Sequence, residues 1–211
     1  NSIGQNARKA ILNKIDTRTK NKILKRYALL LDKEKNSIIS ANQKDIKFAK
    51  KKGLKNNLID RLTIDHKKLV GIKKSIEKIV KIKDPVDCIL EKLRRPNGLT
   101  ISRVSVPIGV LGIIYESRPN VTSDVASLCF KSGNAVILKG GSEAINTNKI
   151  LANLFRKSLK ENKVDQNFIQ FINSKDRKIV DYMLSKMKDY IDVIIPRGGK
   201  SLVKRVQESS T

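Results

Sequence analysis

One stretch of the sequence, NAVILKGGSEA at 134–144, combines residue types that could hold an anion. An apolar run at 135–138 leads directly into a lysine and two glycines, and a serine and a glutamate then open a helical pattern. Glycines let a phosphate approach the backbone closely, and the free N–H groups of a helix N-terminus attract it. The lysine adds a point charge, while the serine or the glutamate can bond ribose hydroxyls or cap the helix. These candidate binding residues are Lys139, Gly140, Gly141, Ser142 and Glu143.

A second stretch, DVIIPRGGK at 192–200, repeats the order of an apolar run, a cation, Gly-Gly and the start of a helix. Its candidate residues are Arg197, Gly198 and Gly199. Two such stretches on one sheet suit a ligand with two ends, such as a dinucleotide. Alternatively, each Gly-Gly pair only makes a tight turn between a strand and a helix. The sequence leaves both interpretations open, because the usual GxGxxG fingerprint is missing.

A third cluster, YESRPNVTSD at 115–124, also follows a predicted strand and runs into a helix. Arg118 can hold a phosphate or a carboxylate through two parallel hydrogen bonds. The amide of Asn120 can stabilise a developing oxyanion. Both residues are therefore candidates for contacting a substrate, although local capping of the helix by Asn120 or Thr122 is the simpler alternative.

The sequence offers no recognisable catalytic nucleophile or acid–base pair. His66 lies at the start of a lysine-rich helix and is expected to be a surface residue. Cys129, in ASLCFKSG, is expected to be a buried core thiol, and Cys88 has no neighbouring group to activate it. The cysteines show neither disulfide nor metal-ligand spacing, which predicts a reducing, cytoplasmic setting and no metal site.

The elements that must position these clusters fall into two main regions. Residues 2 to 83 carry apolar residues at helical spacing, with Thr17 as the expected N-cap of one helix. This region is predicted to be a helical layer packed on a sheet. From Pro107 onward, apolar strands alternate with helices, which predicts a doubly wound parallel sheet. The strands are expected at 109–116, 135–138, 168–172 and 192–195, and the helices at 121–131, 143–161, 174–188 and 199–209. Ligands of such sheets lie at the carboxyl ends of the strands, which is where all three clusters fall.

Residues 86–106 interrupt this pattern with short β-like runs. The turn is expected at 94–98, and an alternating strand at 99–106 has no cleanly apolar face. The ribbon is therefore expected at an edge, or reaching toward another subunit.

The net charge of +25 raises the possibility of a basic nucleic-acid-binding module. Lysines, however, are spread along the whole chain, and aromatic residues make up only 4% of it, so stacking platforms for nucleic acid are scarce. Solvated helix faces explain the charge more simply. No apolar run approaches the ~20 residues that a membrane-spanning helix needs.

The stretch PIGVLGIIYESRPNVTSDVASLCFKSGNAVILKGGSEAINTN resembles the γ-glutamyl phosphate reductases, a family within the aldehyde dehydrogenase superfamily. The resemblance extends upstream through ANQKDIKFAKKKGL, LIDRLT and DPV, and downstream to YIDVIIPRGGKSLVKRVQESST, so it covers nearly the whole chain. It implies an α/β fold like that of aldehyde dehydrogenases, with a Rossmann-type doubly wound parallel sheet and an N-terminal helical layer.

The resemblance also implies an activity and roles for the candidate residues. The reaction would be NADPH-dependent reduction of L-glutamyl 5-phosphate to L-glutamate 5-semialdehyde with release of phosphate, in proline biosynthesis. Residues 139–143 would hold the adenosine ribose and phosphates of NADP, and 197–199 would lie near the pyrophosphate or the nicotinamide. Arg118 and Asn120 would face the substrate, with Asn120 a candidate oxyanion donor.

The family's nucleophilic cysteine belongs to a later segment, in a separate catalytic domain, and neither Cys88 nor Cys129 matches its motif. Residues 1–211 are therefore expected to be an N-terminal NADP-binding domain that is inactive alone, and part of a longer protein. The ribbon at 86–106 would support a homo-oligomer. The alternatives are the basic nucleic-acid-binding module and a degenerate relative that acts through oligomerisation.

Overall fold

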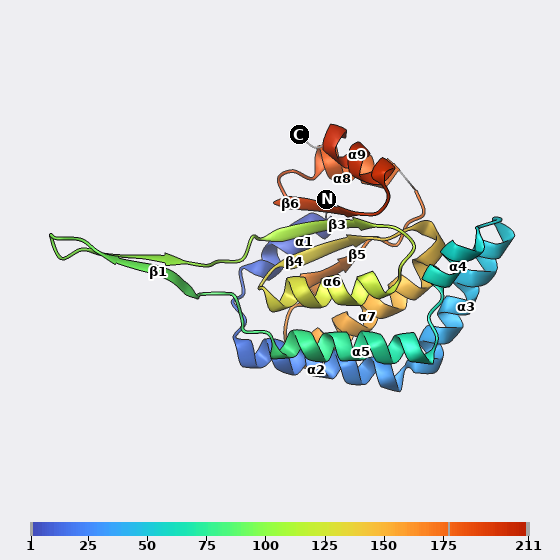
Figure 1. Cartoon of the computed structure of the whole chain (residues 1–211), viewed down its shortest axis with the longest axis horizontal. Helices are drawn as coiled ribbons and strands as arrows, with labels where there is room; N and C mark the ends of the chain where they lie inside the picture. Colours follow the sequence, from blue (N-terminus) through green and yellow to red (C-terminus); the bar gives the residue numbers. More distant parts are fainter. Residues whose placement is uncertain (1, 177, 210–211) are drawn as a thin grey trace.

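The structure, a computed structural model of the chain, describes residues 2–176 and 178–209 and contains a parallel sheet between layers of helices (Figure 1). The strands are β3 (Val110–Tyr115), β4 (Ala135–Lys139), β5 (Ile169–Phe171) and β6 (Val193–Arg197), in the spatial order β5-β4-β3-β6. All neighbouring strands of this sheet run parallel. The predicted doubly wound parallel sheet is confirmed.

Helices cover both faces of this sheet. The crossover helices α6 (Asn120–Lys131) and α7 (Ile145–Glu161) lie on one side, and α8 (Lys178–Lys186) and α9 (Lys200–Ser209) lie on the other (Figure 1). Every residue of β3 and β4 is buried as a result, as their uninterrupted apolar runs predict. β6 is an edge strand whose residues alternate between exposed and half-buried.

The N-terminal helices mainly form a layer outside the crossover helices. Helices α2 (Thr17–Lys33) and α5 (His66–Lys81) pack on α7 and α6, and α3 (Lys35–Lys51) packs on α7 and on α4 (Asn56–Leu62). Helix α1 (Ser2–Ile11) packs directly against β4. The expectation of one helical layer on the sheet is therefore correct for α1 and wrong for α2 and α5, whose apolar faces meet other helices.

The predicted starts of α6, α7 and α9 lie within two residues of the observed ones, and two further helix starts differ in an informative way. The N-cap of α2 is Asp16, whose carboxylate accepts the Thr19 N–H at 2.9 Å, and Thr17 is already the first helical residue. Helix α8 begins at Lys178, four residues after the predicted start at Ser174. Residue 177, which falls inside that predicted helix, lies outside the described residues, as do the ends of the predicted 1–211 domain.

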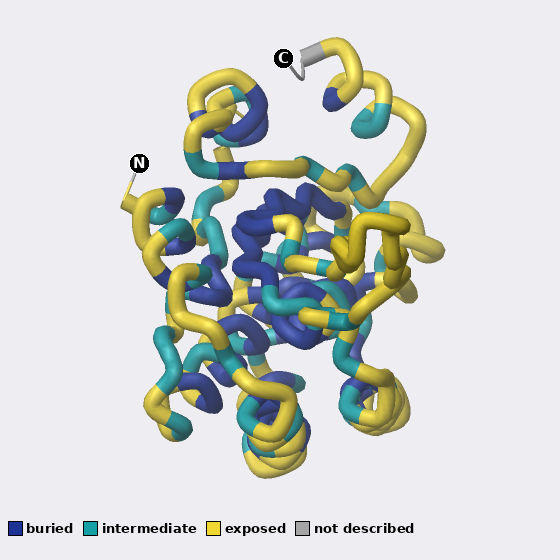
Figure 2. Tube along the Cα trace, turned by 90° about the vertical axis from the view of Figure 1, so that its left-hand side faces the viewer, coloured by how far each residue is buried: buried dark blue, intermediate teal, exposed yellow. Residues whose placement is uncertain are grey.

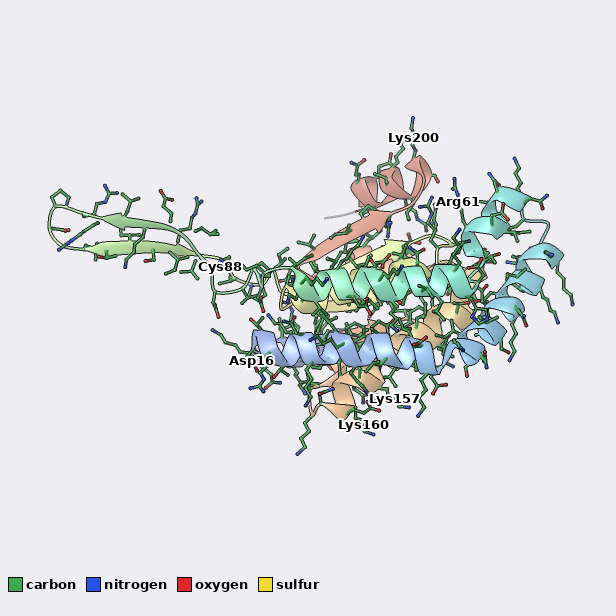
Figure 3. All side chains as sticks on the ribbon, turned by 60° about the horizontal axis from the view of Figure 1, so that its bottom comes forward. Asp16, Arg61, Cys88, Lys157, Lys160 and Lys200 are labelled. Carbon is green, nitrogen blue, oxygen red and sulfur yellow. The ribbon has the colours of Figure 1, made fainter. Side chains whose placement is uncertain are left out.

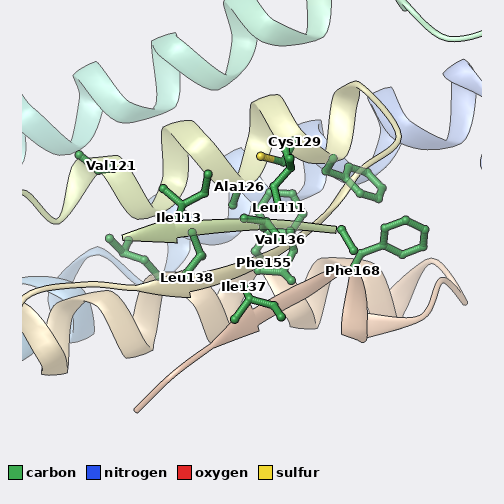
Figure 4. Packing of buried hydrophobic residues seen from close by; sticks show 14 of the residues in the cluster. Leu111, Ile113, Val121, Ala126, Cys129, Val136, Ile137, Leu138, Phe155 and Phe168 are labelled. Carbon is green, nitrogen blue, oxygen red and sulfur yellow. The ribbon is translucent and has the colours of Figure 1, made fainter. Parts of the chain in front are cut away.

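The core includes the space between the sheet and α6 and α7 (Figure 4) and continues into α1, α2, α5 and α8. Aromatic rings from different elements meet there, with Phe130 and Phe155 centroids 5.7 Å apart and Tyr27 and Phe155 centroids 4.5 Å apart. The Tyr27 hydroxyl also reaches the Ser123 Oγ at 2.7 Å, which ties α2 to α6. Figure 2 shows how the buried residues gather around the sheet while the outer faces of the helices stay exposed.

A buried carboxylate on α3 fixes the start of α7. Asp45 is 1% exposed and accepts hydrogen bonds from the backbone N–H of Asn146 at 3.2 Å and of Thr147 at 2.8 Å. It also accepts from the Asn146 amide and the Thr147 hydroxyl, at 2.8 and 2.6 Å. Because free N–H groups at a helix N-terminus need partners, Asp45 caps α7 from a distant part of the chain.

The predicted ribbon is confirmed as the antiparallel pair β1 (Ile89–Arg94) and β2 (Thr100–Val104), which projects away from the rest of the molecule (Figure 1). All residues of both strands are exposed. Its exposed apolar side chains are Ile89, Leu90, Leu93, Leu99, Ile101, Val104 and Val106. None of the helices in the described residues is long and apolar enough to cross a membrane.

Candidate functional site

The three sequence clusters meet at one edge of the sheet. Lys139, the last residue of β4, pairs with Ile114, and Tyr115, the last residue of β3, pairs with Arg197 at the end of β6. The residues that follow these strands therefore leave the sheet side by side. They line three neighbouring spaces, which differ in the clusters that they combine.

The first space, the Lys139 cleft, has a volume of about 360 Å³ and collects the whole first cluster. It also draws residues from the end of β3, from the segment before α8, and from α8 and α9. Its lining residues are Ile114, Tyr115, Glu116, Ser117, Lys139, Gly140, Gly141, Ser142, Glu143, Lys175, Val180, Ser201, Leu202 and Arg205.

Lys139 is the most deeply placed cation of this cleft. The residue is 6% exposed, and its Nζ donates a hydrogen bond to the Gly140 carbonyl at 3.0 Å. Burial lowers the pKa of Lys139, and the charges of Glu143 and Asp176 oppose that shift. Among the described residues, no carboxylate lies within ion-pair distance of its ammonium, so an anionic ligand could supply that partner.

Glu143 is held as a carboxylate on the opposite wall. Ser142 Oγ donates to it at 2.8 Å and Ser117 Oγ at 3.2 Å. Burial raises the pKa of Glu143, but the hydrogen bonds from Ser142, its own backbone and Ser117 outweigh it, and the net pKa is lowered. A fixed carboxylate with free lone pairs is suited to accepting hydrogen bonds from ribose hydroxyls.

Gly140 is required by close packing rather than by the cleft. A Cβ at this position would overlap the Asn148 amide nitrogen and lie 3.0 Å from the Tyr115 ring. Within the described chain, that buried Asn148 Nδ2 has no hydrogen-bond partner. Close packing thus gives a reason for glycine at position 140 that does not depend on a ligand. The position of a Cβ at Gly141, by contrast, faces the side chains of Glu143 and Ser117 in the cleft.

The second space, the Arg197 cleft, has a volume of about 290 Å³ and contains the glycine loop of the second cluster. A carboxylate already lies on that loop, because the Gly199 N–H donates to Glu116 Oε1 at 3.1 Å. Glu116 therefore occupies the anion-binding end of α9 in this structure. The lining residues are Arg61, Glu116, Arg118, Val121, Arg197, Gly198 and Gly199.

The third space, the α4–α5–α6 cavity, is the largest, at about 620 Å³. Arg118 and Asn120 both line it, and Arg118 also lines the Arg197 cleft. The Asn120 amide donates to Asp124 Oδ2 at 3.1 Å, which engages one of the two N–H groups of its NH2. The structure thus brings Arg118 close to the glycine loop and places Asn120 in the adjoining cavity.

The cysteines and the histidine lie away from these spaces. Burial raises the pKa of the Cys129 thiol to about 12, so this core residue stays protonated. Cys88 lies at the base of the ribbon (Figure 3) and donates to the Asp84 carbonyl at 3.2 Å. His66 is the exposed first residue of α5, as expected.

Sequence reasoning overlooked several residues of these spaces. Glu116 and Ser117 stand inside the YESRPN motif and follow a strand directly, so their position was a usable signal. Arg61 on α4 (Figure 3) joins the site only through tertiary packing, whereas Asp124 ends the YESRPNVTSD cluster, one helical turn after Asn120. No local pattern indicates that packing.

Curated proteins similar to the chain carry one name. The chain is 45% identical over 200 residues to a γ-glutamyl phosphate reductase of Persephonella marina, covering 95% of the chain and 45% of that protein. It is also 45% identical over 210 residues to the γ-glutamyl phosphate reductase of Clostridium tetani, covering 99% of the chain and 49% of that protein. The resemblance predicted from the motifs is confirmed, and the chain spans about half the length of these relatives.

Solved structures with a similar fold include proteins of the same name. The crystal structure of a γ-glutamyl phosphate reductase from Thermotoga maritima superposes with a TM-score of 0.96 at 39% identity, covering 100% of the chain and 51% of that structure. The structure of a probable aldehyde dehydrogenase from Listeria monocytogenes superposes with a TM-score of 0.73 at 16% identity. The match covers 100% of the chain and 44% of that structure, and it shows that the two share a fold. The predicted aldehyde-dehydrogenase-like fold is confirmed. No protein-family model matches the chain.

Proposed function

We propose that this chain, which is similar over nearly its whole length to γ-glutamyl phosphate reductases, is the NADP-binding part of such an enzyme. The reaction would be the reduction of L-glutamyl 5-phosphate to L-glutamate 5-semialdehyde, with NADPH as the reductant and phosphate released. The observation that carries this proposal is the meeting of residues 139–143, 116–118 and 197–199 at one sheet edge. Such an edge is where ligands of doubly wound sheets bind.

The residues of the Lys139 cleft fit a phosphorylated dinucleotide. Lys139 and Lys175 supply positive charge on its walls, while Arg205 is already paired with Asp181 at 2.7 Å, and Glu143 supplies a hydrogen-bond acceptor for a ribose. We propose that 139–143 hold the adenosine ribose and phosphates, while the Arg197 loop adjoins the pyrophosphate or the nicotinamide. A bound nicotinamide would supply the hydride, and the residues of this chain would bind and orient it.

The nucleophile is proposed to lie outside residues 1–211. Cys129 is buried in the core with a raised pKa, and Cys88 lies at the base of the ribbon. Neither thiol lines the three spaces at the sheet edge. The chain by itself is therefore expected to bind NADPH without reducing the acyl phosphate.

The ribbon β1–β2 is proposed to contact another copy of the protein. Its apolar side chains are exposed on both strands, far from the core. Large exposed apolar side chains gathered on one projecting element are typical of an interaction site.

Replacement of Lys139 by methionine tests the dinucleotide site. Methionine keeps a long apolar stem in the buried position and removes the charge together with the hydrogen bond to the Gly140 carbonyl. Since a charge-assisted hydrogen bond to phosphate contributes about 1.5–3 kcal/mol, we expect NADPH affinity to fall roughly tenfold or more. Calorimetric titration with NADPH and then NADH, at about physiological salt, measures this.

Lys188→Met is the matched control, because this exposed lysine lies away from the cleft. It should leave NADPH affinity unchanged. Two outcomes would favour the basic nucleic-acid-binding module instead. One is an equal loss of NADPH affinity in both lysine variants, and the other is NADPH binding that disappears with added salt in a chain that also binds DNA. No NADPH binding by the folded wild-type chain would contradict the proposal.

Replacement of Glu116 by glutamine tests the glycine loop. Glutamine can still accept the Gly199 N–H, but it removes the negative charge that now faces the N-terminus of α9. A dinucleotide phosphate near this loop would meet less repulsion, so we expect NADPH to bind roughly threefold to tenfold more tightly at low salt.

The control for this variant is Glu208→Gln, near the C-terminal end of the same helix, where Glu208 pairs with Lys204 at 3.6 Å. This control also removes one negative charge, but from a position on α9 away from the glycine loop, so it should change NADPH affinity little. Weaker NADPH binding by Glu116→Gln would show that Glu116 contacts the dinucleotide favourably, against the expected repulsion.

A further inference from the structure

The α4–α5–α6 cavity carries charges of both signs that are not paired with each other. Asp124 lines it from α6, Arg61 from α4 and Arg118 from the loop before α6. No salt bridge between described residues involves any of these three side chains. Lys68, another cation of the wall, is already bonded to the Thr63 carbonyl at 2.8 Å and to the Asp60 carbonyl.

Asp124 is the unusual member of this set. Its Oδ2 accepts from the Asn120 amide at 3.1 Å, whereas its Oδ1 is buried and has no hydrogen-bond partner in the described part of the chain. A carboxylate oxygen shielded from water without a donor is unfavourable, so it is a strong site for a cationic donor. Because rotation about the Cβ–Cγ bond of aspartate is soft, either oxygen can be turned toward the cavity.

The two arginines lie toward the other end of the same space. Arg61 and Arg118 line both this cavity and the adjoining Arg197 cleft, next to the glycine loop. Both side chains are exposed. A pair of guanidinium groups at the junction is suited to a phosphate. The volume of about 620 Å³ lies within the range of small-molecule sites.

We propose that this cavity binds the substrate lengthwise, with its α-ammonium on Asp124 and its acyl phosphate between Arg61 and Arg118. The inference rests on the proposed function, and it specifies the orientation of the bound substrate. The amino-acid end lies between α5 and α6, and the reacting acyl phosphate lies at the strand ends, beside the glycine loop. Asp124 would thus select an α-amino acid over a simple dicarboxylic acyl phosphate.

The test uses two stable phosphonates as probes and the whole chain as the protein. One probe, 2-amino-5-phosphonopentanoate, carries the amino-acid end, and the other, 5-phosphonopentanoate, lacks the amine. Titrations followed by NMR or calorimetry should show the amine-bearing probe binding roughly tenfold more tightly, as one charge-assisted contact provides. Asp124→Asn, which can keep the contact with Asn120, should abolish this preference. Arg118→Ala should weaken both probes equally.

Asp60→Asn is the matched control, since Asp60 is an exposed acid on the same cavity, and it should keep the preference for the amine. Equal affinity of the wild-type chain for both probes, no binding of either, or a preference that survives in Asp124→Asn overturns the inference. NADPH titrations of the same samples separate this outcome from failure of the proposed function, because Asp124→Asn should bind NADPH normally. Thermal melts verify that each variant is folded.

Discussion

Replacement of Asp45 by alanine is expected to lower the free energy of unfolding by about 3 kcal/mol, because it leaves buried donors without an acceptor. The carboxylate now accepts both backbone and side-chain hydrogen bonds from Asn146 and Thr147 at the start of α7. Thr147 is fully buried, so water cannot replace the lost acceptor. Urea unfolding followed by circular dichroism measures the change, with the slope checked for two-state behaviour.

A matched control for this variant is Asp32→Ala. Asp32 is an exposed carboxylate that pairs with Lys73 at 3.1 Å, and its loss should cost less than about 1 kcal/mol. If Asp45→Ala lowered the free energy of unfolding by a similarly small amount, the start of α7 would not depend on the hydrogen bonds from Asp45. Because α7 follows residues 139–143 directly, the Asp45 variant should also weaken NADPH binding under conditions where the chain stays folded.

Replacement of Gly109 by alanine is expected to destabilise the chain by about 3 kcal/mol, from backbone strain and a collision together. Gly109 has a φ of 129°, which L-residues rarely adopt, and an added Cβ would overlap Asp192 Oδ2. Asp192 cannot move freely, because it accepts from Arg8 at 2.7 and 2.8 Å and from the Val110 N–H at 2.7 Å.

A reference variant without any collision is Gly53→Ala. Gly53 also has a positive φ, of 69°, but an added Cβ there meets nothing within 4 Å. It should cost only the conformational strain, about 1 kcal/mol, and equal losses in the two variants would show that Asp192 yields at little cost.

The Gly109 variant should also change the response to acid. Burial raises the pKa of Asp192, but the bonds from Arg8 and Val110 outweigh it and hold the pKa below its ordinary value. A lowered folded pKa contributes stability that is present above the unfolded value of about 3.9 and is lost as pH falls through the folded value. Gly109→Ala should lose part of that acid-sensitive contribution, which unfolding curves between neutral and acidic pH measure.

Much of the fold could be predicted because the signals are local. The run at 135–138 is apolar on both faces, and it became the fully buried β4. The turn signal at 94–98 and the alternating residues after it predicted the ribbon, which the structure contains as the pair β1 and β2. The start of α2 was misplaced by one residue, because Asp16 and Thr17 are both good caps and only the backbone geometry decides between them.

The sequence could predict only those residues of the candidate site that lie at or directly after the ends of strands. A parallel sheet places Lys139 and Arg197 at the same edge, so that much follows from the sequence pattern. The two residues end strands that β3 separates and line different clefts, which the pattern does not predict. The cap that Asp45 places on Thr147 spans 102 residues, and the cavity contacts of Asp124 depend on how α4 and α5 pack. The orphaned Asp124 Oδ1 is likewise a property of the packed chain, because an aspartate in a helix is ordinarily solvated.

The ion pair between Arg8 and Asp192 joins residues separated by 184 positions. During synthesis, Arg8 on α1 is therefore made 184 residues before the carboxylate that pairs with it. At about 5–20 residues per second, that interval is on the order of ten seconds or more. The sheet is also completed late, but after a shorter interval, since Leu111 of β3 pairs with Val193 of β6 only after β4 and β5 have been made. Such long-range closure predicts slow, late completion of the sheet and a period in which the buried face of α1 is accessible to chaperones.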